Sequence, residues 1–179
     1  MKPQRRHMVA GTIGIVMIGA IAPVAFASGG GSVTASTLTQ QKLDGTVQAK
    51  GNGVKVQTKV PTEIVMQRVT FLAGGFTGWH HHPGVVLVSV QSGAVTVWDS
   101  DCDSTTYGPG LPAGTVFTES GDDALEVTSA MGGTVLATFI VPQVAGGKPL
   151  LRLEDDKVSC VGTEQSDDDR HEMSNADHH

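Results

Sequence analysis

Residues 74–93 read GGFTGWHHHPGVVLVSVQSG, and this stretch decides the fold. Glycine pairs and a Pro-Gly turn bound a valine-rich run at 85–90, which is typical of a short buried strand. His80 and His82 lie two residues apart at the predicted end of a strand. Side chains alternate along a strand, so we expect these two rings on one face and His81 on the other.

Similar short runs, rich in Val, Thr and Phe, lie on both sides of this stretch. They cover residues 54–60, 64–71, 94–98, 115–118, 125–128 and 134–141. Residues 54–60 alternate apolar and polar side chains, which predicts a half-buried strand. Glycine or proline separates nearly every run, and no helical pattern is visible beyond the first thirty residues. The sequence therefore predicts an all-β sandwich or small barrel.

The ends of the chain differ in composition from this centre. Residues 1–27 combine Lys2, Arg5 and Arg6 with an uncharged stretch and a terminal Ala25-Phe26-Ala27, which is the pattern of a secretory signal peptide. An uncleaved membrane anchor is the alternative, because nineteen uncharged residues (8–26) could just span a bilayer. We expect a cleaved signal and a secreted protein that is not attached to a membrane.

The mature chain divides into three parts. Residues 28–52 are rich in Gly, Ser, Thr and Gln and predict a flexible lead-in. Residues 53–161 hold the predicted strands and form the expected barrel. Residues 162–179 are acidic and histidine-rich and almost lack apolar side chains, so we expect a disordered tail.

The charge of the chain limits its partners. Lys and Arg number 12 against 18 Asp and Glu, a net charge of −6. Nucleic-acid binding needs clustered positive charge, so this balance argues against a nucleic-acid partner. A small-molecule ligand or substrate is the partner we expect.

The two cysteines, Cys102 and Cys160, are expected to form a disulfide. In an exported chain two cysteines most often pair with each other. A reactive or metal-binding thiol pair is the alternative, but no CxxC spacing supports it. Cys102 lies between Asp101 and Asp103 in an acidic loop, where we expect a solvated turn; a complete calcium-loop pattern is absent.

The spacing within residues 74–93 resembles the first conserved motif of the cupin family, Gly-x5-His-x-His-x3or4-Glu-x6-Gly. Gly74, His80, His82 and Gly93 stand at the matching positions, and Val86 replaces the glutamate. Pro112-Ala113-Gly114 resembles the Pro-x-Gly of the second motif. The stretch 79–84 also looks like small single-domain cupins exported by actinobacteria. The resemblance implies an antiparallel jelly-roll β-barrel, with its motif histidines pointing inward to bind a metal.

The second motif departs from the family pattern. Phe117 stands where the motif has its metal-binding histidine. With a short insertion, Glu126 aligns better with that position, and Glu119 is a weaker substitute. The resemblance therefore implies His80, His82 and Glu126 as the ligand set. Two histidines and one carboxylate suit a divalent transition metal (Mn, Fe, Zn, Cu or Ni) and leave open positions on it.

Two functions remain open at this point. The first is a metal-binding protein or metal enzyme of unspecified reaction that acts on a small molecule. The second is a degenerate, metal-free cupin that binds a ligand or acts as a surface protein, with an apolar pocket near Val86, Trp98 and Phe117. Barrels of this family often pair through edge strands, so a homodimer is compatible with the resemblance.

Overall fold

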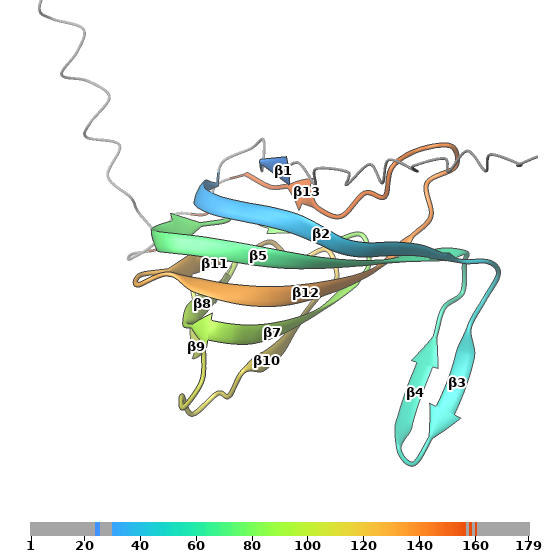
Figure 1. Ribbon diagram of the computed structural model, residues 1–179, viewed down its shortest axis with the longest axis horizontal. Coiled ribbons are helices and arrows are strands. Elements are labelled where there is room, and N and C mark those ends of the chain that lie inside the picture. The colour runs from blue at the N-terminus through green and yellow to red at the C-terminus, as the bar shows by residue number, and fades with distance from the viewer. Residues whose placement is uncertain (1–23, 26–29, 157, 159, 161–179) are drawn as a thin grey trace, which may run out of the picture.

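The computed structural model describes residues 24–25, 30–156, 158 and 160, and it is all-β (Figure 1). The described residues contain no helix, as the sequence predicts. Accordingly, none of their segments is a helix with the length and hydropathy of a membrane span. The predicted signal peptide, apart from the short β1 (Val24–Ala25), and the predicted tail 162–179 lie outside the described residues.

Five antiparallel strands form the larger layer of the barrel, the broad sheet that faces the viewer in Figure 1. Their order is β10, β7, β12, β5, β2. The bounds are Val116–Ser120 for β10, Val85–Gly93 for β7, Gly133–Pro142 for β12, Thr62–Phe76 for β5 and Gly31–Leu43 for β2.

A second set of strands completes the barrel. Its order is β13 (Leu153–Glu154), β6 (His80–His81), β11 (Leu125–Ser129), β8 (Val95–Asp99) and β9 (Ser104–Tyr107). The long strand β5 joins the two sets, because Gly75 and Phe76 at its end pair with β11. The histidine strand β6 therefore lies next to β11 and β13, across the barrel from the larger layer.

Alternating side chains fill the interior between the two sets of strands. Along β7, Val86, Val88 and Val90 are buried, while Val85 and Leu87 are exposed on the outer face. The register places Val86 beside Phe139 of β12, which in turn pairs with Val65 of β5. Period-2 alternation thus gives these barrel strands a core face. The core residues are Ala35, Val65, Val69, Phe71, Val86, Val88, Val90, Val95, Phe117, Val127, Val135, Ala137, Phe139 and Val141.

The structure corrects the expected flexible lead-in over 28–52. Most of this segment is strand: β2 pairs with β5 along nearly its whole length, and Ala35 is 2% exposed. The sequence does not indicate this strand, because Ser, Thr and Gln make β2 polar at most positions of both faces and leave no apolar alternation. Backbone pairing with β5 orders it all the same, so the barrel begins at Gly31 and not at residue 53.

The half-buried strand expected over 54–60 is also wrong. Residues Val54–Gln57 form β4, which pairs only with β3 (Gln48–Gly51) in a separate two-stranded sheet. All eight residues of this hairpin are exposed, and it projects away from the barrel in Figure 1. Alternation alone does not indicate burial, because a solvated hairpin has the same period.

The two motif glycines, Gly74 and Gly93, are required by the backbone. Their φ angles are 73° and 69°, in the left-handed region that only glycine adopts at little cost. A Cβ on Gly93 would also lie 2.2 Å from the carbonyl oxygen of Gly132, where β7 meets the start of β12. These positions therefore need glycine for chain direction and close packing.

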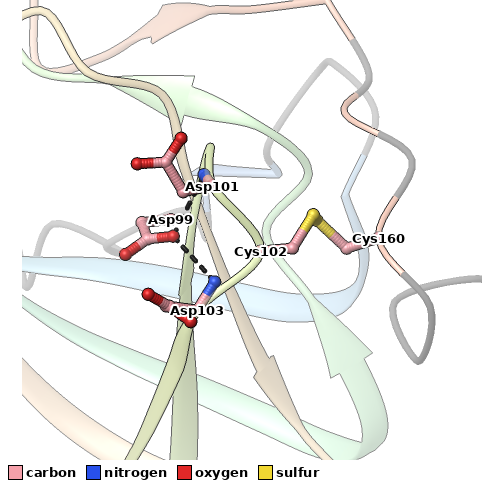
Figure 2. The surroundings of a disulfide bond; sticks show 5 residues. All are labelled: Asp99, Asp101, Cys102, Asp103 and Cys160. Atoms are coloured by element: carbon pink, nitrogen blue, oxygen red, sulfur yellow. Dashed lines mark hydrogen bonds between the residues drawn. A yellow bond between two sulfur atoms is a disulfide. The ribbon is translucent and has the colours of Figure 1, made fainter.

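The predicted disulfide joins Cys102 to Cys160, with a Cα–Cα distance of 5.4 Å (Figure 2). It ties the loop between β8 and β9 to the chain that follows β13. In that loop the Asp99 carboxylate accepts backbone hydrogen bonds from Asp101 (3.1 Å) and Asp103 (2.9 Å), as Figure 2 shows. The aspartates are exposed, so the acidic loop is the solvated turn that the sequence predicts.

Candidate metal centre

His80 and His82 turn into the barrel, as their spacing predicts. Both are 4% exposed and both line the same internal cavity. Their rings are perpendicular, with centroids 4.8 Å apart. His81 points the other way and contacts Asp155, with Nδ1 2.9 Å from the carboxylate. His80 and His82 thus lie together at the cavity, whereas His81 contacts the segment that contains Asp155.

Backbone carbonyls fix the ring nitrogens of both inward histidines. His80 Nδ1 lies 2.9 Å from the carbonyl oxygen of Gly78, and His82 Nδ1 lies 2.6 Å from that of Leu151. A carbonyl only accepts hydrogen bonds, so each Nδ1 carries the proton and donates it. In a neutral ring the lone pair is then on Nε2. Metal-binding histidines are held in this way, with the second nitrogen donating to a carbonyl or carboxylate.

The third member of the group is Glu119, from β10. Its Oε2 lies 3.0 Å from His82 Nε2, although the alignment is not that of a hydrogen bond. Glu119 is 7% exposed and pairs across the strands with Val86, the residue that replaces the motif glutamate. Directly paired residues share a face, so Glu119 enters the interior beside Val86.

His80 is held in its neutral form. Burial, followed by the positive charge of Arg152, lowers its pKa to about 3, although the hydrogen bond to the Gly78 carbonyl opposes this shift. At neutral pH the ring therefore needs no deprotonation before its Nε2 can donate to a metal. A buried neutral imidazole is the form that metals bind.

The distances within the group suit a single metal ion. One ligand atom from each of His80, His82 and Glu119 lies within 4.8 Å of the others. Two ligand atoms at right angles on one metal, each about 2.1 Å from it, are about 3.0 Å apart. The His82–Glu119 contact has this spacing, and a small inward rotation of one side chain would bring the widest pair into range. Two imidazoles and one carboxylate are the donor set of many transition-metal sites.

The structure does not bring the predicted ligand Glu126 into this group. Glu126 follows Leu125 on β11 and precedes Val127, which lines the cavity, so its side chain points to the opposite face of the strand. It is 4% exposed and pairs across the strands with Trp98 of β8. The alignment with the second motif made it the expected ligand, but the strand alternation places its apolar neighbours inside instead.

A cavity of about 350 Å³ opens beside the three side chains. Of the predicted pocket residues, Phe117 lines it; Val86 is fully buried in the core and does not. Trp98 lies on the outer face of β8, where its Nε1 donates a hydrogen bond to Thr128. The lining consists of Ala35, Gln67, Val69, Phe71, Thr77, His80, His82, Val88, Phe117, Glu119, Val127, Val135, Ala137, Phe139, Pro149, Leu151, Arg152 and Glu154.

Residues 149–155, which we call the C-terminal strap, form part of this lining and were not foreseen from the sequence. Strap residues Leu153 and Glu154 pair with the histidine strand β6, and Asp155 donates its N–H to the Trp79 carbonyl. Leu151 accepts the His82 hydrogen bond described above. The one sequence feature that indicates attachment of this segment to the barrel is Cys160, five residues after the strap, through its expected disulfide with Cys102.

Comparison with known proteins gives likenesses of fold only. The chain is similar to a cupin-2 domain protein of Rhodospirillum rubrum, with 15% identity and a TM-score of 0.47 over 76% of this chain and 78% of that one. It is also similar to the polyketide cyclase RemF of Streptomyces resistomycificus, with 13% identity and a TM-score of 0.45 over 71% and 78% of the chains. An oxalate oxidase solved with glycolate is similar over 45% of this chain and 43% of that one, with 19% identity and a TM-score of 0.37.

No protein-family model matches the chain, and no curated protein is similar to it.

Proposed function

We propose that this chain is an exported cupin-type protein that holds one divalent transition metal with His80, His82 and Glu119 and presents it to a small molecule in the cavity. One observation carries the proposal: two buried imidazoles are held through Nδ1 by backbone carbonyls, and one ring nitrogen of each lies within 4.8 Å of the other and of a buried carboxylate oxygen. A histidine that only packs in a hydrophobic core does not require a second imidazole and a carboxylate beside it.

The contact between His82 and Glu119 supports a cation at this place. In the neutral ring, His82 Nε2 carries a lone pair, and the carboxylate oxygen 3.0 Å away carries lone pairs as well. Two such acceptors repel one another at this distance unless a proton or a metal ion lies between them. His80 lines the same cavity, and a metal bound there would be held by all three side chains together.

Three protein ligands leave positions open for a ligand from the cavity. A bound divalent ion there would act as a Lewis acid and polarise an oxygen atom of a small molecule. His80, His82 and Glu119 would hold the ion, while the apolar walls restrict water and orient the ligand. The donor set is compatible with Mn, Fe, Zn, Cu or Ni and does not select one.

A metal-free ligand-binding barrel is the second candidate. The observation in its favour is Phe117, which occupies the place of the second-motif histidine and stacks on Tyr107 with ring centroids 4.5 Å apart. Most of the cavity wall is apolar, so an uncharged ligand could bind without any ion.

Metal content separates the two candidates. The test uses residues 28–161, without the tail histidines and without an affinity tag, beside a His80→Ala/His82→Ala variant of the same length. We expect close to one equivalent of a transition metal in the first protein by elemental analysis after dialysis against a metal mixture, and none in the variant. Metal-free protein in both cases, with native far-UV circular dichroism, would reject the metal site in favour of the second candidate.

A further inference from the structure

The cavity contains one strongly basic side chain. Arg152 is the only lysine or arginine among the residues that line it, and its side chain is 11% exposed. It belongs to the C-terminal strap, directly after Leu151, whose carbonyl holds His82. Its guanidinium Nη2 lies 3.1 Å from the carbonyl oxygen of Thr77, which precedes Gly78, the residue whose carbonyl holds His80. Arg152 therefore lies at the metal end of the cavity.

Two hydrogen bonds to described residues help to hold the guanidinium in place. Its Nη2 donates to the Thr77 carbonyl (3.1 Å) and to the Glu154 carboxylate (2.7 Å). Glu154 is 39% exposed, so this carboxylate lies at the mouth of the cavity beside solvent. An arginine held in this way is suited to recognise a carboxylate, and here it already contacts one that belongs to the chain itself.

The charges around the cavity favour an anionic ligand once a metal is present. Among the described lining residues, Arg152 carries one positive charge and Glu119 and Glu154 carry one negative charge each. Histidines that bind a metal are neutral and add none, so these side chains sum to one negative charge. A divalent ion reverses this balance to one positive charge, which a ligand with a single negative charge would neutralise.

The rest of the cavity suits an apolar body. Beyond the polar end, the walls are valine, alanine and phenylalanine side chains, among them Val69, Phe71, Val135 and Phe139. The volume of about 350 Å³ is near the lower end for small-molecule sites. A ligand that fills it needs one polar end and a compact apolar part.

We propose that the ligand is a small organic monocarboxylate, whose carboxylate binds Arg152 beside the metal and whose apolar part fills the chamber. In binding, the ligand carboxylate takes the place of Glu154 on the guanidinium, and Glu154 turns to solvent. This inference rests on the proposed metal site, because the bound ion supplies the positive charge that makes the cavity attract an anion.

Calorimetric titration of the metal-loaded protein tests the inference, with two acids and their uncharged amides as probes: benzoate and benzamide, 3-methylbutanoate and 3-methylbutanamide. We expect at least one acid to bind at least about tenfold more tightly than its amide, which is the range of a charge-assisted hydrogen bond. Metal content is measured on the same samples. A protein without metal would reject the proposed function, whereas a metal-loaded protein that prefers neither acid to its amide would reject only the carboxylate site.

Two variants with opposite expected effects separate recognition by Arg152 from binding to the metal alone. Arg152→Gln should lose the preference for the acid while keeping the metal, and Glu154→Gln should tighten acid binding because no carboxylate has to be displaced. The matched controls are Arg68→Gln and Asp122→Asn, which remove exposed charges away from the cavity lining. An Arg152→Gln protein that binds the acid as tightly as the wild type would overturn the inference. If that variant fails to fold, unchanged or weaker acid binding in Glu154→Gln would do so.

Discussion

Glu119 of β10 is the cross-strand neighbour of Val86 of β7, and its carboxylate lies 3.0 Å from His82 Nε2. Val86 stands at the position where the first cupin motif has its glutamate. Because directly paired residues of antiparallel strands share a face, Glu119 enters the barrel interior at nearly the same place. The acidic group beside the histidines therefore comes from β10 and not from β7.

Glu119 is therefore expected to matter for metal binding, and Glu126 is not. Glu119→Gln removes a charged ligand, so the dissociation constant for a divalent metal should rise by more than the 10- to 100-fold typical of a lost outer-shell contact. Glu126→Gln, the matched change on the opposite face of β11, should bind as the wild type does. Metal titration of both variants by competition with a chelating dye is the measurement. A larger loss in Glu126→Gln would support the ligand set first inferred from the sequence.

The disulfide is expected to support both the fold and the metal site. It closes a loop of 58 residues, worth about 4 kcal/mol of unfolding free energy in the chain-entropy model. Cys102→Ser/Cys160→Ser should lower the midpoint of urea unfolding accordingly. Because the strap that carries the Leu151 carbonyl is then fastened less firmly, metal affinity should fall as well. If this double-serine variant binds metal unchanged while it unfolds more easily, the disulfide stabilises the barrel without helping the site.

The stability of the metal-free protein should decrease in acid because of His80. The pKa of His80 is about 3 in the folded chain against an ordinary value of 6.5, so between these values the unfolded chain binds the proton first. The free energy of unfolding should then fall as the pH drops below 6.5, by up to about 1.4 kcal/mol per pH unit from this residue, and level off near pH 3.

Urea unfolding of chelator-treated wild type and His80→Asn between pH 4 and pH 7 measures this contribution. The variant lacks the titrating ring, so its pH dependence should be shallower by the amount that His80 contributes. Parallel curves for the two proteins would show that the folded and unfolded chains protonate His80 alike.

Gly93 is expected to tolerate alanine less well than Gly110. Both have a positive φ, 69° and 81°, so alanine costs about 1–2 kcal/mol of backbone strain at either position. Only Gly93 faces a backbone oxygen at 2.2 Å; nothing lies within 4 Å of a Cβ on Gly110. Gly93→Ala should therefore lower the melting temperature further than Gly110→Ala. Equal shifts would mean that β7 and β12 move apart without cost.

Local chemistry made part of this structure predictable from the sequence. Spacing and strand alternation are enough for the all-β class and for the shared face of His80 and His82. The pairing of Cys102 with Cys160 follows from the presence of two cysteines in a chain that is expected to be exported. Strand β2 was missed because an edge-like strand of Ser, Thr and Gln has no apolar alternation and owes its order to β5. Glu119 ranked below Glu126 because cross-strand register, which brings it to His82, depends on partners distant in sequence.

Crystals of the protein soaked in a zinc or manganese salt would test the metal centre most directly, through the anomalous scattering of the bound ion. We predict one strong peak about 2.0–2.2 Å from Nε2 of His80, Nε2 of His82 and a carboxylate oxygen of Glu119. A fully soaked crystal with no peak in the cavity, or with its only peak at the exposed aspartates of the Cys102 loop, would contradict the account.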